Sequence, residues 1–233
     1  MRRRTLWLVA IPLFLVLLAM GGTWVYFNVI SENAPAPLTF EGRDEQTGVT
    51  GSGGDTVEAS AITGTWRPTP ASRVGYRVDE VVFGQSRAAA GSTNAVTGEL
   101  ILDATQVRAA ALTADMTKVT SDEAHRDGWF HGRIMDTANY PNATFGLSSP
   151  IRFDTVPADR QQATYQASGD LTLRGTTKAV TFPLKARRSG NTIEVNGTIP
   201  IVFEEWNIPN PSIGPASTED NGVLEFLIVF EKA

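Results

Sequence analysis

The residue types best suited to catalysis gather in one stretch, residues 121–140, which holds both histidines of the chain. His125 and His131 flank Asp127, a combination that could serve as an acid/base pair or bind a metal. Their spacing argues against both roles, because it places the two imidazoles on different sides of a helix that Gly128 interrupts. A metal would also need three or four ligands, and the other carboxylates are scattered along the chain. We therefore expect no catalytic residue, no metal site and no cofactor.

A structural role for this stretch is the simpler interpretation. It lacks the alternation of a strand and begins with the capping signal of Ser121, so it predicts a short helix and loop that cross between strands. Arg126 and Asp127 would then pin the crossing to a strand end through charge-assisted hydrogen bonds. The absence of cysteine excludes thiolate chemistry and a disulfide scaffold, and the net charge of −5 does not suit a nucleic-acid surface.

From Gly64 onward the dominant signal is an alternation of apolar and polar residues with period two. About eight such runs, each polar on one side, predict an antiparallel sheet. Gly-containing turns at 174–176 and 189–191 connect runs as hairpins. Closure would remove the exposed edges, so we predict an all-β fold, a lipocalin-like up-and-down barrel with one short helical crossing. A two-sheet sandwich would satisfy the same alternation.

The amino-terminal part predicts a membrane attachment. Arg2, Arg3 and Arg4 precede an almost wholly apolar run from Leu6 to Phe27, which is long enough to cross a bilayer. We predict a cytoplasmic amino terminus (1–5), one transmembrane helix that acts as a signal anchor (6–30), and an extracytoplasmic remainder. A cleaved signal peptide is the competing interpretation.

The next segment, 31–63, is acidic and rich in Gly, Ser and Pro, so it predicts a disordered linker. The alternative is that residues 38–40 add an edge strand to the folded domain. That domain is predicted to span residues 64–233.

Three stretches carry a resemblance to a known family. Residues 71–76 look like its opening strand, and residues 126–127 followed by 140–145 are similar to its Arg-Asp and Tyr-Pro-x-x-x-Phe signature. Residues 169–180 match a Gly-x-Leu-Thr-x-x-Gly-x-Thr-x-x-Val hairpin, the most specific of the three. The domain resembles the YceI-like, polyisoprenoid-binding proteins, which are extracytoplasmic barrels of lipocalin type.

This resemblance implies binding of a long amphiphilic chain, such as an isoprenoid or a quinone, and it implies no catalysis. Ala71 stands where the family often has His, and Tyr76 where it has Phe, so a role of that histidine does not transfer. The residues that the resemblance marks as a structural signature are Arg126, Asp127, Tyr140, Pro141 and Gly175.

A barrel of about eight strands either fills with side chains or holds one ligand. Its predicted inward faces include the small residues Ala114, Ala143, Ala167 and Ala186, which leave room, and almost no charge. We expect an apolar ligand, with aromatic residues of the crossing covering one barrel mouth. The expected ligand-binding residues are Val74, Tyr76, Trp129, Phe130, Ile134, Met135, Phe145, Ala167, Leu171 and Phe182.

The sequence thus favours a membrane-tethered, extracytoplasmic binding protein for a lipid, isoprenoid or quinone, with no nucleic-acid partner. Two alternatives remain at this point. One is an enzyme on an apolar substrate that uses Asp127 with His125 or His131. The other is a scaffold module with a filled barrel.

Overall fold

The computed structural model describes residues 34–48, 58–153, 155–212 and 216–233. The predicted cytoplasmic terminus (1–5) and membrane helix (6–30) lie outside these residues. No helix in the described part is long and apolar enough to span a bilayer. The folded unit runs from Ala34 to Ala233, so it begins well before the predicted domain boundary at residue 64.

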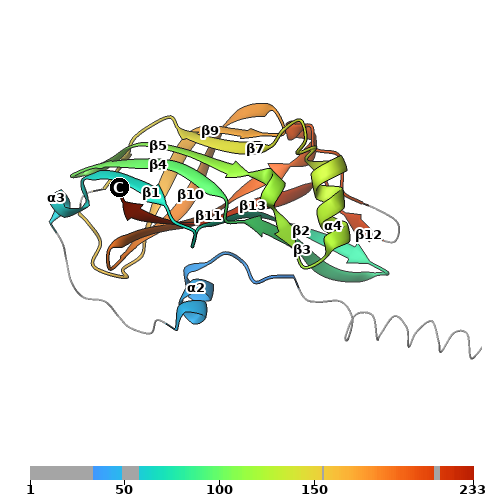
Figure 1. The fold of residues 1–233 in the computed structure, drawn as a ribbon, viewed down its shortest axis with the longest axis horizontal. Coiled ribbons are helices and arrows are strands. Elements are labelled where there is room, and N and C mark those ends of the chain that lie inside the picture. The colour runs from blue at the N-terminus through green and yellow to red at the C-terminus, as the bar shows by residue number, and fades with distance from the viewer. Residues whose placement is uncertain (1–33, 49–57, 154, 213–215) are drawn as a thin grey trace, which may run out of the picture. The chain divides into compact units, whose positions relative to one another are not determined.

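Eight antiparallel strands of the described chain close into a barrel (Figure 1). The barrel closes because β13 pairs with β1 as well as with β11. The predicted all-β barrel is confirmed, and the sandwich alternative is wrong. In order around the barrel, the strands are β1 (Gly64–Pro68), β4 (Val96–Asp103), β5 (Gln106–Asp115), β7 (Asn142–Leu147), β9 (Ala163–Leu173), β10 (Thr176–Ser189), β11 (Thr192–Val202) and β13 (Asn221–Lys232).

A hairpin of β2 (Arg73–Val82) and β3 (Gln85–Thr93) continues the sheet from β13. Two short strands extend it, since β6 (Thr120–Ser121) pairs with β3 and β12 (Ala216–Thr218) pairs with the far end of β2. Phe83 and Gly84 form its turn, both with left-handed φ, 51° and 80°. A two-residue turn of this hand matches the twist of the flanking strands.

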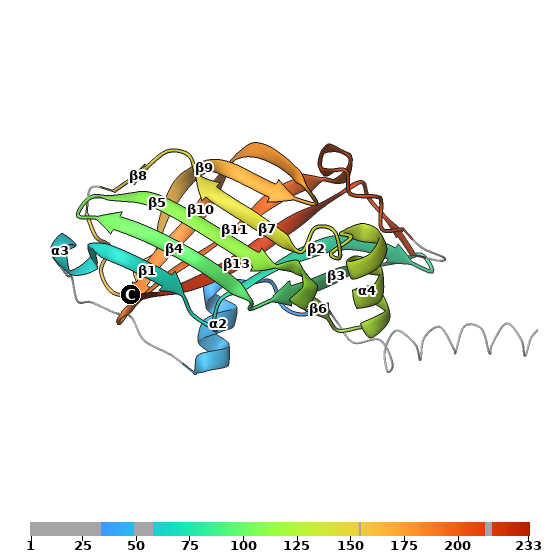
Figure 2. The ribbon, with the colours of Figure 1, turned by 45° about the horizontal axis from the view of Figure 1, so that its top comes forward.

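The helical crossing lies at the same end of the barrel as this hairpin, whereas α3 (Ala59–Ile62) lies at the opposite end (Figure 2). The crossing consists of α4 (Ala124–Trp129) and a π-helical turn, η3 (Phe130–Ile134). The sequence predicted that Ser121 caps α4, and this prediction is wrong. The N-cap residue is Glu123, which makes no side-chain capping bond. Ser121 instead donates from its backbone N–H and its hydroxyl to Asp127, at 2.8 and 2.6 Å.

Residues 34–48, which we call the docked segment, are structured and pack on the outside of the barrel. The sequence predicted a disordered linker here, with an edge strand at residues 38–40 as the alternative. The structure has a helix, α2 (Phe40–Thr47), whose N-cap Thr39 accepts a hydrogen bond from the backbone N–H of Gly42. Its left-handed C-cap, Gly48, ends the helix.

A group of four charged side chains holds the docked segment on β10 and β11. The Arg187 guanidinium donates to both carboxylate oxygens of Asp44, at 2.7 and 2.8 Å, and to Glu194 at 2.8 Å. Arg43 donates to the other oxygen of Glu194 at 2.8 Å. Because two cations meet two anions with paired hydrogen bonds, the burial of these charges is compensated.

Apolar contact completes this docking. Phe40 is only 1% exposed, and the guanidinium of Arg187 lies 4.5 Å from the centre of its ring. On β13, Leu227 and Val229 point outward, yet they are buried like their inward neighbours. These two outward apolar residues were the sequence signal that some part of the chain must cover this strand.

Candidate ligand-binding site

The barrel encloses a cavity of about 190 Å³. Every barrel strand except β1 contributes side chains to it, and nearly all of them are aliphatic or aromatic. The wall includes Leu100, Leu112, Phe145, Leu171, Phe182, Val195, Ile199, Phe226 and Ile228. A space lined in this way excludes water and suits an apolar guest.

Small side chains on the inward faces keep this space open. Ala114, Ala143, Ala167 and Ala186 all line the cavity, and they come from β5, β7, β9 and β10. Each is a position where a leucine or phenylalanine would fill the interior. The predicted alanine faces therefore surround the cavity.

Aromatic rings form a continuous part of the cavity wall. Phe182 lies edge-to-face between Phe145 and Phe226, with ring centres 5.6 and 5.8 Å away. Gly169 makes room for the first of these rings, since a Cβ there would lie 2.5 Å from Phe145 and 2.4 Å from the carbonyl oxygen of Gly146. The glycine thus lets Phe145 lie against the wall.

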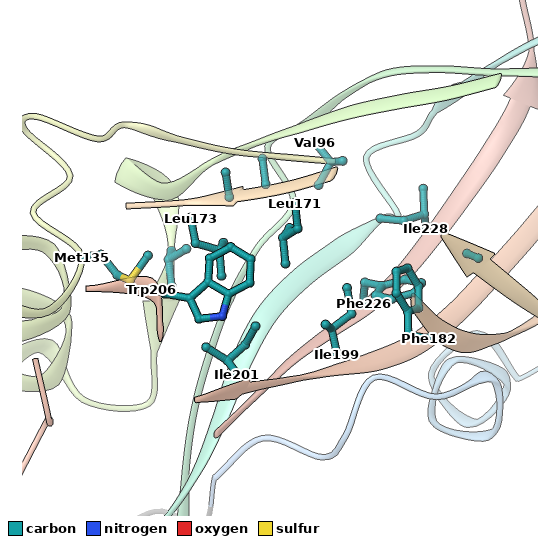
Figure 3. Close-up of a cluster of buried hydrophobic side chains, with 14 of the residues drawn as sticks. Val96, Met135, Leu171, Leu173, Phe182, Ile199, Ile201, Trp206, Phe226 and Ile228 are labelled. Carbon is teal, nitrogen blue, oxygen red and sulfur yellow. The ribbon is translucent and has the colours of Figure 1, made fainter. Parts of the chain in front are cut away.

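The cavity stops at the end of the barrel that carries α4, which we call the closed end. Buried side chains fill this end, and Trp206 lies beside Leu173 and Ile201 with Met135 close by (Figure 3). Trp206 belongs to η4 (Phe203–Trp206), a single turn of 3-10 helix that follows β11. None of Leu173, Ile201, Trp206 and Met135 lines the cavity.

The opposite end, which we call the open end because its interior is hollow, is bounded by α3 and by the loop between β8 (Ile151–Arg152) and β9. Ile62 of α3 lines the cavity there, as do Phe153 and Val156 of the loop. Phe153 meets Tyr165 edge-on at 6.5 Å, and burial raises the pKa of the Tyr165 hydroxyl. Phe153 and Val156 could not be predicted from the sequence, because the loop has no periodic pattern.

A polar clasp holds the same loop on the β10–β11 hairpin at the open end. Asp159 accepts a hydrogen bond from the backbone N–H of Gly190 at 2.8 Å and pairs with Arg188 at 3.2 Å. The backbone N–H of Arg160 donates to the carbonyl oxygen of Arg188 at 2.8 Å. Charged groups therefore stand at the rim, while the interior is apolar.

The structure divides the ten predicted ligand-binding residues into two groups. Five of them line the cavity: Val74, Phe145, Ala167, Leu171 and Phe182. The other five do not: Tyr76, Trp129, Phe130, Ile134 and Met135. The crossing packs over the closed end and does not line this cavity, so its expected contact with a ligand stays a prediction.

The aromatic residues of the crossing serve packing instead. Phe130 is buried and stacks on Tyr76 with ring centres 4.9 Å apart and planes 12° apart. Burial raises the pKa of the Tyr76 hydroxyl. Trp129 faces a shallow surface depression together with His125 and Arg133.

The five signature residues all make structural contacts. Asp127 holds Ser121 as described above, and Arg126 pairs with Asp122 and lies 3.6 Å from Glu80 on β2. The carbonyl oxygen of Pro141 accepts a hydrogen bond from Met116 at 2.8 Å.

The Tyr140 ring packs against Gly175. Gly175 has a left-handed φ of 73°, and a Cβ there would lie 2.5 Å from the Tyr140 ring. Only glycine meets both demands of this turn.

The two histidines do not meet. His125 is exposed on α4, whereas His131 has its Nδ1 3.5 Å from the Thr137 hydroxyl. Among the described residues no three or more His, Asp or Glu side chains gather in a way that could hold a metal ion.

A closed antiparallel barrel with an apolar cavity in its interior is the architecture of proteins that enclose one small ligand. The YceI-like domain model matches residues 67–230. The chain therefore belongs to the YceI-like domain family, and its recognition by sequence motifs is confirmed for the domain.

Individual relatives agree with this assignment. The protein YceI of Escherichia coli O17:K52:H18 is 33% identical over 119 residues, which are 46% of this chain and 56% of that protein. The chain thus spans about half the length of the curated relatives it matches.

Among solved structures, Burkholderia cenocepacia BcnA has 22% identity and a TM-score of 0.55, over 70% of this chain and 98% of its own. A polyisoprenoid-binding domain from Saccharophagus degradans has 16% identity and a TM-score of 0.57, over 73% of this chain and 99% of its own. At these identities the likeness shows the barrel fold.

Proposed function

We propose that this protein binds one long apolar or amphiphilic molecule, such as an isoprenoid, a quinone or another lipid, inside the barrel. The cavity of about 190 Å³ carries the proposal, because its wall is apolar. The solved domain described as polyisoprenoid-binding has the same fold, which supports this class of ligand.

The size of the cavity limits how much of the ligand the barrel encloses. A cavity of roughly 150 Å³ holds a benzene molecule, whereas sites for drug-sized ligands run from about 300 to 1,000 Å³. An apolar tail entering at the open end would contact the alanine faces and the aromatic wall. Its polar end would remain at the rim, beside Arg188 and Asp159.

Binding without catalysis is the function we propose. Asp127 is the central residue of the enzyme hypothesis. One of its carboxylate oxygens accepts hydrogen bonds from the backbone N–H and the hydroxyl of Ser121. It lies at the closed end, beyond the filled core. The YceI-like family is a family of binding domains, which is consistent with this reading.

We further propose that the protein is attached to the cell membrane by one helix, residues 6–30, with the barrel on the extracytoplasmic side. Basic residues precede this apolar run and acidic residues follow it, which supports an amino terminus that stays in the cytoplasm. Protease added to intact spheroplasts should digest the barrel. Complete protection of the barrel would contradict this orientation.

The test of ligand binding is native mass spectrometry of the full chain purified from its own host in a mild detergent. We expect one lipid-sized adduct per chain, which organic solvent extracts as an isoprenoid, quinone or acyl lipid. Adding a long-chain isoprenoid alcohol to the stripped protein should restore one adduct. A chain that carries no adduct and takes up none would contradict the proposal.

A further inference from the structure

The tip of the β2–β3 hairpin exposes apolar side chains in a backbone geometry that does not suit them. Phe83 is 63% exposed and Val81 is 40% exposed. Phe83 has a φ of 51°, which is uncommon for a bulky residue, and Asn or Gly is the usual choice in this kind of turn. An exposed phenylalanine here serves neither the turn nor the core, so it points to a function outside the folded domain.

The tip is also free of charge. Residues 81–86 contain no ionisable side chain. Behind them Glu80 accepts from Arg87 at 2.6 Å and lies 3.6 Å from Arg126, whereas Asp79 is exposed. An uncharged apolar tip suits the boundary between headgroups and acyl chains of a bilayer.

The docked segment brings the chain to this hairpin. Arg77 on β2 donates to the carbonyl oxygen of Pro35 at 2.7 Å, and the same guanidinium pairs with Glu225 at 3.1 Å. Further along, Asn196 donates to the carbonyl oxygen of Leu38 at 3.3 Å, and Asp44 binds Arg187 near the open end. The segment therefore runs along the barrel from the hairpin side toward the open end.

Chain lengths then limit how far the hairpin stands from a membrane. If the membrane helix ends at residue 30, the chain from there to Pro35 spans at most about 18 Å, at roughly 3.6 Å per residue. The strand from Arg77 to Val82 spans about 17 Å, at roughly 3.3 Å per residue. The two lengths are similar, which supports contact of the hairpin tip with the bilayer.

We propose that the hairpin tip, through Phe83 and Val81, inserts into the bilayer. The barrel then stands with its open end away from that membrane, and the ligand exchanges on the aqueous side. This inference rests on the membrane attachment proposed above. It does not depend on the identity of the ligand.

The chain has no cysteine, so single-cysteine labelling can test this proposal in the full-length protein. We would attach an environment-sensitive fluorophore at Gln85→Cys, beside the tip, and in a second variant at Asn191→Cys, in the turn of the open end. The labelled protein would be reconstituted into phosphatidylethanolamine and phosphatidylglycerol vesicles that contain a nitroxide-labelled phospholipid. The proposal predicts strong quenching of the tip probe and several-fold weaker quenching of the open-end probe.

Two substitutions at Phe83 distinguish membrane insertion from a folding effect. Phe83→Asn suits the left-handed turn but removes the apolar side chain, so quenching of the tip probe should fall several-fold without a lower melting temperature. Phe83→Leu keeps an apolar group in the same geometry and should retain most of the quenching.

Resistance of the reconstituted protein to alkaline extraction tests the membrane helix separately. A chain that resists extraction but whose tip probe is not quenched would overturn the hairpin proposal alone. Equal quenching at both probes would overturn the orientation. A chain that alkaline treatment releases would contradict the membrane attachment, and the hairpin inference would fall with it.

Discussion

The two ends of the barrel share the same strands but differ in the size of their inward side chains. Along β9 the inward residues change from Ala167 near the cavity to Leu173 at the closed end, where Trp206 joins them. The closed end has a packed core, whereas at the other end the strands surround a cavity. The comparison shows that one β-barrel can be a stable fold and a binding site at once, with side-chain volume deciding which part is which.

The two ends also differ in what stabilises them. The closed end depends on its interior, which the crossing and η4 fill. The wall near the open end has little interior packing, and the docked segment covers it from outside through Phe40 and the Arg187 charge group. Substitutions at the two ends should therefore affect stability and ligand binding in different proportions.

The largest effect on stability is expected at the closed end. Trp206→Ala removes a buried side chain from a packed core and should lower the free energy of unfolding by about 3–5 kcal/mol. Chemical denaturation would measure this change. Native mass spectrometry should find the ligand still bound, since Trp206 does not line the cavity. Loss of the ligand with unchanged stability would reverse the assignment of the two ends.

A substitution at Arg187 tests how much the charge group that holds the docked segment stabilises the barrel. Arg187→Met leaves the buried Glu194 with Arg43 alone, so the free energy of unfolding should fall by about 3 kcal/mol. The matched control is Lys178→Met, which breaks the more exposed pair with Glu205 and should cost less than about 1 kcal/mol. Equal losses in the two variants would mean that the Arg187 charge group contributes no more stability than an exposed ion pair.

The turns before and after β10 lie at opposite ends of the barrel, so glycine substitutions in them allow a direct comparison of the two ends. Gly175 and Gly190 both have left-handed φ, 73° and 58°, but only a Cβ at Gly175 would collide, with Tyr140. Gly175→Ala should therefore cost about 2–3 kcal/mol and Gly190→Ala about 1 kcal/mol, as judged by thermal unfolding. A Gly190→Ala variant that is the less stable of the two would contradict the role given to Tyr140.

A smaller effect should appear in the pH dependence of the docked segment. Hydrogen bonds from Arg187 hold the pKa of Asp44 below its usual value of 3.8. A lowered pKa means that this stabilisation is full above pH 4 or so and is lost as the pH falls through the folded-state pKa. The stability difference between the wild type and Asp44→Asn should shrink at acid pH in denaturation curves. A difference that grows below pH 4 would contradict this linkage.

The barrel itself could be predicted from sequence because a half-buried strand has a strict period of two. The alanine faces were visible for the same reason. The direction of the crossing could not be predicted, since a π-helical turn rotates Phe130 and Met135 into the closed end, and no local pattern specifies that rotation. The docked segment was missed because its charges look solvated until Arg187 and Glu194, far along the chain, are placed beside them.

The central claim is that the barrel is hollow at one end and filled at the other. Ala167→Phe adds a ring inside the cavity, whereas Val119→Phe adds one to the buried core that does not line it. Lipid bound per chain and the midpoint of unfolding, measured together on both variants, test the claim most directly. We predict that Ala167→Phe loses the lipid with little change in the stability of the ligand-free protein. Val119→Phe should keep the lipid and lose about 1–3 kcal/mol through overpacking. Lipid retained by Ala167→Phe, together with a sharp drop in its stability, would contradict the claim.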